Sequence, residues 1–91
     1  MPDLSNQCQA RTLVVPLTPI PLNACRAKIG ICLKANRNNQ GSIYFGGSDV
    51  TVTGNGYELL PGDTVFLPVD NAKIIYMIAV LNGDKVSYFV V

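Results

Sequence analysis

The sequence of 91 residues contains no histidine and no tryptophan, and only 14% of its residues are charged. A typical globular domain carries about 25% charged residues. Without histidine, a serine or cysteine nucleophile has no imidazole base to activate it. Seven basic and six acidic residues leave a net charge of +1, which gives no electrostatic reason to bind nucleic acid or an anionic membrane. These shortages favour a structural or binding protein over an enzyme.

The six acidic residues are not arranged as a catalytic or metal site. Five of them lie in predicted turns or near the N-terminus, where aspartate commonly caps the backbone. The spacing of Asp49, Asp63 and Asp70 matches no calcium-binding loop. The Gly46-Gly47 pair leads into a predicted strand, whereas a phosphate loop leads into a helix. The sequence therefore predicts no catalytic residue, no metal ligand and no cofactor.

The sequence has three cysteines, and their spacing does not suggest that they act in pairs. Cys8, Cys25 and Cys32 are an odd number without a Cys-x-x-Cys pattern, which argues against a disulfide framework and a zinc site, while a Cys25–Cys32 bridge stays open. The first ten residues lack the pattern of a signal peptide, and the longest apolar run, residues 73–81, is too short for a transmembrane helix. We therefore expect synthesis in a cytoplasm, with reduced thiols.

What the sequence does contain is a series of short apolar segments separated by turns. Between residues 41 and 71, turns rich in glycine, asparagine, aspartate and proline separate four predicted strands, at residues 42–45, 50–53, 57–60 and 64–67. Residues 26–35 alternate apolar and polar side chains, as in a strand with one wet face. Residues 73–81 and 85–91 flank Asn82-Gly83, a strong hairpin signal. The predicted fold class is all-β, a small antiparallel β-sandwich.

The N-terminal segment has a different pattern. Three prolines hold it extended, and three apolar side chains alternate with them: Pro16, Leu17, Pro19, Ile20, Pro21 and Leu22. We interpret residues 1–22 as an extended, proline-containing arm and residues 23–91 as the sandwich domain. The apolar side chains of the arm lie either on the protein's own sheet or on a neighbouring subunit. A small chain with so few charges is expected to hide apolar surface against copies of itself or another protein.

Four segments in a fixed order carry a resemblance to a known group of proteins. They are IYFGGSDVT, NGYELLPGDTVFLPVD, KIIYMIA and GDKVSY, at residues 43–51, 55–70, 73–79 and 83–88. Together they resemble small virion proteins of tailed bacteriophages, and most of all capsid decoration, or cement, proteins. The resemblance covers residues 27–91. It implies a jelly-roll subunit that sits as a homotrimer on the outer surface of the phage head, with the major capsid protein as partner, after assembly in the host cytoplasm.

This implied role assigns contacts to two parts of the chain. The apolar strands near the C-terminus would form the trimer contact, with Ile75, Tyr76, Met77, Tyr88 and Phe89 as candidates. The proline segment would contact the shell, because a stiff ribbon loses little entropy on docking, with Leu17, Ile20 and Leu22 as candidates. The alternative function is a virion fibre or tail module that binds host-surface carbohydrate through its tyrosines.

Overall fold

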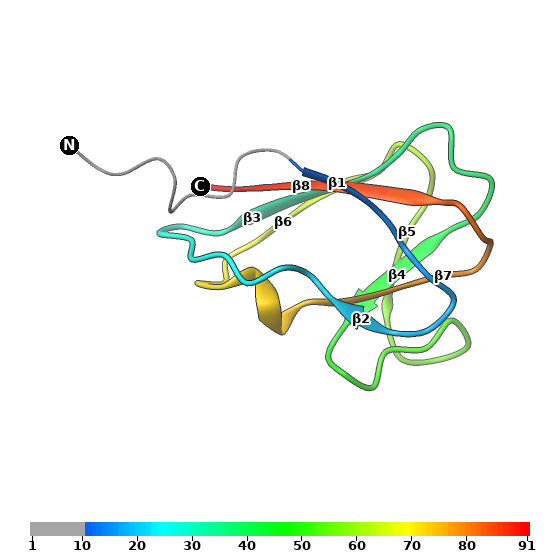
Figure 1. Cartoon of the computed structure of the whole chain (residues 1–91), viewed down its shortest axis with the longest axis horizontal. Helices are drawn as coiled ribbons and strands as arrows, with labels where there is room; N and C mark the ends of the chain where they lie inside the picture. The colour runs from blue at the N-terminus through cyan, green and yellow to red at the C-terminus, as the bar shows by residue number, and fades with distance from the viewer. Residues whose placement is uncertain (1–10) are drawn as a thin grey trace.

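The computed structural model describes residues 11–91, which form two four-stranded antiparallel sheets packed against each other (Figure 1). Sheet A has the strand order β1-β8-β3-β6, and sheet B has the order β2-β7-β4-β5. The elements are β1 (Arg11–Val14), β2 (Ile20–Pro21), β3 (Ile31–Ala35), β4 (Ile43–Gly46), β5 (Tyr57–Leu59), β6 (Thr64–Leu67), the short 3-10 helix η2 (Ala72–Ile74), β7 (Tyr76–Ala79) and β8 (Lys85–Val90). The prediction of an all-β antiparallel fold is therefore confirmed.

Six of the seven connections between strands pass from one sheet to the other, and only β4 and β5 are joined within a sheet. The hairpin predicted for residues 73–81 and 85–91 is therefore wrong. The turn at Asn82-Gly83 is present, with a φ of 90° at Gly83, but it joins β7 of sheet B to β8 of sheet A. Both strands are apolar, and each lies between two neighbours in its own sheet: β7 between β2 and β4, and β8 between β1 and β3. These positions bury more of their apolar side chains than a hairpin of β7 and β8 would.

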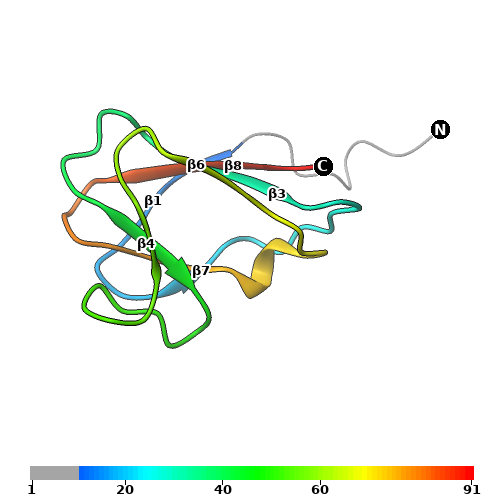
Figure 2. The same cartoon turned by 180° about the vertical axis from the view of Figure 1, so that it is seen from behind.

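Residues 50–53, predicted as a strand, belong instead to a loop that follows β4 (Figure 2). The loop, residues 47–56, folds back over the outer face of sheet B and buries Val50 to 2% exposure. A Cβ at Gly56 would lie 2.8 Å from Cγ2 of Val50, so glycine permits this close packing. The hydroxyl of Thr51 accepts hydrogen bonds from the backbone N–H groups of Gly54 and Asn55, which holds the loop closed.

The core lies between the two sheets, because alternate residues of the central strands point inward. Its members from these strands are at most 7% exposed: Ile31, Leu33 and Ala35 of β3, Ile43 and Phe45 of β4, Met77 and Ala79 of β7, and Val86 and Tyr88 of β8. The strand predicted for residues 26–35 is shorter than expected and begins at Ile31, with Arg26 forming a single bridge to Asn71. The remainder of that segment connects β2 to β3.

Residues 11–22 are part of the sandwich, which corrects the predicted arm of residues 1–22. β1 pairs with β8 along its whole length, and Ile20 and Pro21 of β2 pair with Met77 and Tyr76. Proline is accommodated there because β2 is an edge strand, whose outer side needs no hydrogen-bonded partner. The proline segment therefore lies on the protein's own sheets. Residues 1–10 of the predicted arm lie outside the described residues.

Tyr88 has the one buried side-chain oxygen or nitrogen atom without a hydrogen-bond partner in the range 11–91. Its side chain is 1% exposed, and an unpartnered buried hydroxyl costs about 1–3 kcal/mol. We expect Tyr88→Phe, which removes only this oxygen, to raise the midpoint of thermal unfolding by about 4–8 °C. Differential scanning calorimetry measures the shift, with Tyr57→Phe at a 73% exposed position as the control. A lower midpoint for Tyr88→Phe would contradict this reading of the core.

Candidate interaction surfaces

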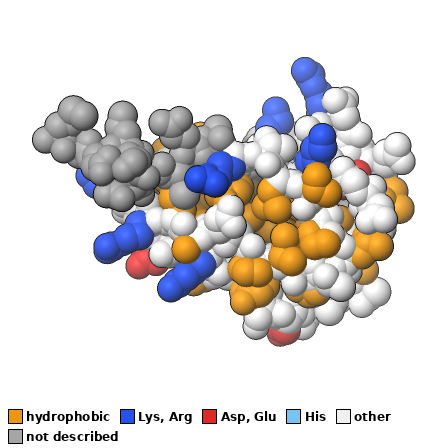
Figure 3. Space-filling model, viewed as in Figure 1, with side chains coloured by type: hydrophobic (Ala, Val, Ile, Leu, Met, Phe, Trp, Pro, Cys, Tyr) orange, Lys and Arg blue, Asp and Glu red, His pale blue; other side chains and the backbone are white. Residues whose placement is uncertain are grey.

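Within residues 11–91, no group of three or more histidine, cysteine, aspartate or glutamate side chains could hold a metal ion. The surface is distinguished instead by exposed apolar side chains. They gather at the side of the molecule where the proline segment passes from sheet A to sheet B, with lysine and arginine side chains to the left and at the top of the view (Figure 3). Residues 12–25 and 74–83, which form much of this side, contain no charged residue.

We call residues 14–19 the proline edge, because they connect the edge strands β1 and β2 across the side of the sandwich. Val14 is 54% exposed and Leu17 is 49% exposed, and Pro19 is also exposed. The backbone is fixed near the start of the edge, where the N–H of Val15 donates to the carbonyl of Asp84 and the carbonyl of Pro16 accepts from the N–H of Ala79, each over 2.9 Å. Its far end leads directly into β2, which pairs with β7. A partner that binds this edge would meet an apolar surface that is already ordered, at little entropic cost.

The outer face of sheet A carries a second apolar surface. Cys32 is paired with Phe89 on one side and Phe66 on the other, so these three side chains form a row across β8, β3 and β6. Phe66 lies over Gly30, where a Cβ would overlap its ring. Beside this row runs a polar row, in which the hydroxyls of Thr12 and Ser87 lie 2.8 Å apart.

A groove of about 310 Å³ lies on this face. It is lined by Cys32, Leu33, Lys34, Thr64, Ser87, Tyr88 and Phe89. Leu33 and Tyr88 point into the core, so they reach the groove through their backbone atoms. The groove is wide enough to receive apolar side chains from a partner.

The predicted trimer residues are divided between the core and the surface. Ile75, Met77 and Tyr88 are at most 4% exposed, so their side chains pack inside the subunit and leave no area for a contact with another one. Phe89 is 42% exposed on the outer face of sheet A, and Tyr76 is half-buried on the outer face of sheet B. The available trimer candidates are thereby reduced to these two residues.

The predicted shell residues are divided in the same way. Leu17 is exposed at the proline edge, and Ile20 is half-buried. Leu22 is 2% exposed and belongs to the core, where its N–H donates to the carbonyl of Ile75. Proline and leucine alternate along this segment, but only Leu17 among the three candidates presents a large apolar side chain to a partner.

The cysteines differ from the sequence-based expectation of reduced thiols. Cys25 is disulfide-bonded and 5% exposed, whereas Cys32 is a free cysteine on the outer face of sheet A. A Cys25–Cys32 bridge is therefore not formed.

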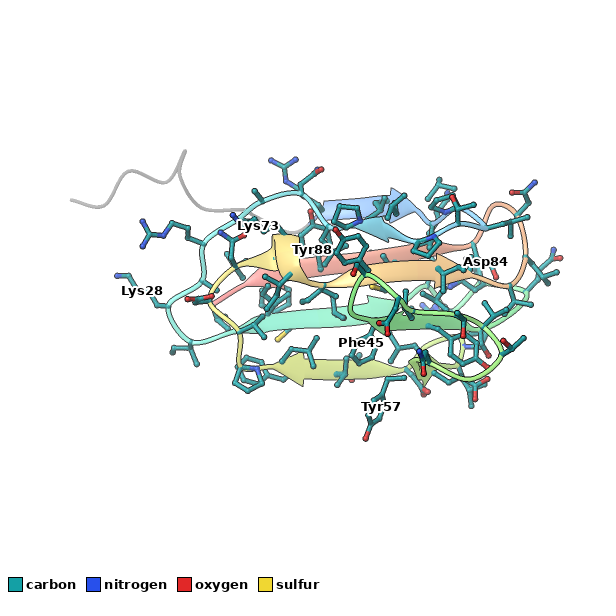
Figure 4. All side chains as sticks on the ribbon, turned by 90° about the horizontal axis from the view of Figure 1, so that it is seen from below. Lys28, Phe45, Tyr57, Lys73, Asp84 and Tyr88 are labelled. Atoms are coloured by element: carbon teal, nitrogen blue, oxygen red, sulfur yellow. The ribbon has the colours of Figure 1, made fainter. Side chains whose placement is uncertain are left out.

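Among residues 11–91, the buried polar or charged residue is Asp84, at 4% exposure. The sequence alone predicts only that Asp84 occupies a turn. Its carboxylate accepts hydrogen bonds from the backbone N–H groups of Gln40, over 3.0 Å, and Gly41, over 2.9 Å. Beside it, the amide side chain of Asn39 donates to the carbonyl of Lys85 and accepts from its N–H. These bonds fasten the loop between β3 and β4 to the turn between β7 and β8 (Figure 4). Both carboxylate oxygens are engaged by the backbone, so Asp84 acts as a structural clamp.

The tyrosines do not form a shared platform for sugar binding. Tyr57 is 73% exposed and points away from the molecule (Figure 4), with its ring stacked on Phe45 at a centroid distance of 5.6 Å. Tyr44 and Tyr76 are half-buried on the outer face of sheet B, and Tyr88 is in the core. A single tyrosine is therefore freely presented.

Comparison of the chain with protein-family models, with curated proteins and with solved structures finds no match. Among the described residues, none of the helical segments has the length and apolar character needed to cross a bilayer. Any functional assignment therefore depends on the residues and surfaces described above.

Proposed function

We propose that this chain is a structural virion protein, a capsid decoration or cement protein that binds the outer surface of a phage head as a homotrimer and stabilises the shell. The observation that carries the proposal is the proline edge, an apolar surface without charges that the two sheets hold in place. The sequence resemblance over residues 27–91 supports the same role. In this role the chain performs no chemistry, and its partners are other copies of itself and the major capsid protein.

The finer description of the sandwich as a jelly roll belongs to this proposal. It is supported by the strand orders β1-β8-β3-β6 and β2-β7-β4-β5, since in a jelly roll eight strands wrap around a barrel-like core as two four-stranded sheets. Jelly rolls occur in viral capsid proteins and also in lectins and cupins, so the fold is compatible with the function but does not select it.

The proposal assigns the proline edge to the shell. We expect Leu17→Asp to weaken binding to phage heads about 10-fold or more, because a desolvated carboxylate would face the apolar contact. Co-sedimentation of purified protein with heads that lack it measures the binding. The matched control is Leu60→Asp, at a similarly exposed position (52%) in the turn between β5 and β6. Unchanged binding of Leu17→Asp would remove the proline edge from the shell contact.

Deletion of residues 1–22 is not a suitable test, because it would remove β1 and β2 from both sheets. The test of the function itself compares the thermal stability of heads with and without the wild-type protein. Heads without it are expected to burst at a lower temperature and to recover when it is added. A wild-type protein that does not bind heads, and that is found instead in tails, would overturn the proposal.

The alternative, a fibre or tail module that binds host carbohydrate, is supported by one observation, the exposed ring of Tyr57 stacked on Phe45. Binding of glycans by the wild-type protein and its loss in Tyr57→Ala, with head stability independent of the protein, would favour this alternative.

A further inference from the structure

Tyr76 and Phe89 lie on opposite sides of the sandwich. In β7 the neighbouring Met77 points into the core, so Tyr76 points out from sheet B. In β8 the neighbouring Tyr88 points into the core, so Phe89 points out from sheet A. A symmetric contact between two identical faces would use one of these residues and leave the other uncovered. A contact that uses both must join unlike faces.

The two outer faces carry charges of opposite sign. Lys34 and Lys85 project from the outer face of sheet A, opposite Ser87 and Val14 respectively, and the four strands of sheet A contain no acidic residue. Sheet B has no lysine or arginine in its four strands, and neither has the loop of residues 47–56 that covers part of it. Its charges are Glu58, which accepts a hydrogen bond from the hydroxyl of Ser42 over 2.6 Å, and Asp49 in the loop.

We propose that copies of this chain associate head to tail, with the outer face of sheet A of one copy packed on the outer face of sheet B of the next. This inference rests on the proposed function only in requiring self-association, and it specifies the surfaces involved. The row of Phe89, Cys32 and Phe66 would face Tyr76 and Pro21 of the neighbouring copy. Lys34 and Lys85 would lie against the side that bears Glu58 and Asp49. A contact between two copies of the same face would bring charges of one sign together, and their repulsion disfavours that contact.

Head-to-tail contacts between opposite faces stack copies one on the next, and they close into a ring only where the two faces are inclined so that the rotation between copies divides a full turn. A face of four strands, about 4.8 Å apart and on average four residues long at about 3.3 Å per residue, offers about 250 Å² of projected area. A stable complex of two proteins buries more than this, about 800 Å² on each partner. A subunit with a neighbour on each side uses both faces and buries twice the area of one face, so each added copy stabilises the assembly further. Val14 lies on the outer face of sheet A, so the rest of the proline edge, residues 15–19, then stays free for the shell.

The test reverses the charges of one face at a time in the full chain. Lys34→Glu with Lys85→Glu makes both faces acidic, and Asp49→Lys with Glu58→Lys makes both faces basic; all four positions are exposed. We expect the dissociation constant of the oligomer to rise about 100-fold in each double variant. The variant with all four substitutions, in which the two faces have exchanged charge, should assemble again. Light scattering after size-exclusion chromatography gives the oligomeric state, and Lys28→Glu with Lys73→Glu, outside both faces, is the matched control.

Two further results decide between this contact and its rivals. An equimolar mixture of the two double variants is expected to form mixed assemblies, because each acidic face then meets a basic one. The inference is overturned if the wild-type protein is monomeric, if the variant of Asp49 and Glu58 assembles like the wild type, or if the fourfold variant is folded but stays monomeric. Binding of wild-type protein to heads is scored separately. If the wild-type protein binds heads but the charge reversals do not change its oligomeric state, the head-to-tail contact is overturned and the proposed function remains.

Discussion

Replacing Asp84 with alanine is expected to lower the free energy of unfolding by about 3–5 kcal/mol. The carboxylate is 4% exposed and accepts two backbone hydrogen bonds, from Gln40 and Gly41. Its removal leaves two N–H groups of a part-buried site without this acceptor, and hydrogen bonds to charged groups are worth about 1.5–3 kcal/mol each. For a chain of this size the loss corresponds to a fall of about 15–30 °C in the midpoint of thermal unfolding. Circular dichroism during heating measures it.

Two variants separate the clamp from a general effect of removing acidic residues. Asp84→Asn keeps one acceptor oxygen, so we expect about half the loss. Asp63→Ala removes an exposed carboxylate that accepts from the N–H of Leu60 over 3.0 Å, and we expect about 1 kcal/mol. A change below about 1 kcal/mol for Asp84→Ala would show that the loop between β3 and β4 does not depend on this residue.

Leu22→Ala is expected to destabilise the fold by about 2–5 kcal/mol, because it opens a cavity in the core. Leu22 is 2% exposed and packs with the residues of both sheets. Urea unfolding followed by tyrosine fluorescence measures the change. Leu17→Ala is the matched control, since Leu17 lies in the same segment at 49% exposure, and we expect less than about 1 kcal/mol for it. If both variants unfold like the wild type, the segment would behave as an arm and not as part of the sandwich.

Much of the fold could be predicted from the turns. The predicted strands at residues 42–45, 57–60 and 64–67 match β4, β5 and β6 to within a residue, because glycine, proline and aspartate mark their ends. Residues 50–53 show the limit of the same method. Their alternation of valine and threonine is typical of a strand, but the Thr51 hydroxyl satisfies two backbone N–H groups of the next turn, so the segment folds on itself.

The partner of each strand could not be predicted from local patterns. Asn82-Gly83 provides the positive φ that a tight turn requires, and such a turn is equally suited to a hairpin and to a passage between sheets. What decides is the burial gained when β8 lies between β1 and β3, which involves residues far apart in the chain.

The contact residues were predicted only in part for a related reason. β7 is apolar on both sides: Met77 faces the core, and Ile78, on the outer face, is 7% exposed because neighbouring residues of the same chain cover it. The sequence therefore does not distinguish an inward position such as Met77 from an outward one such as Tyr76. The opposite charges of the two faces were likewise hidden, since they appear only once the strands are sorted into their sheets.

The position of β8 has a consequence for the order in which the molecule forms. β8, which lies in the middle of sheet A, leaves the ribosome after the seven other described strands. Its neighbours β1 and β3 therefore emerge earlier, without the strand that hydrogen-bonds to both of them. Local helices or hairpins cannot guide such a topology, and native pairings this distant in sequence close slowly, on a scale of about milliseconds to seconds. Until residues 85–90 arrive, the nascent chain exposes unpaired apolar strands, and we expect its solubility during translation to depend on the speed of that last step.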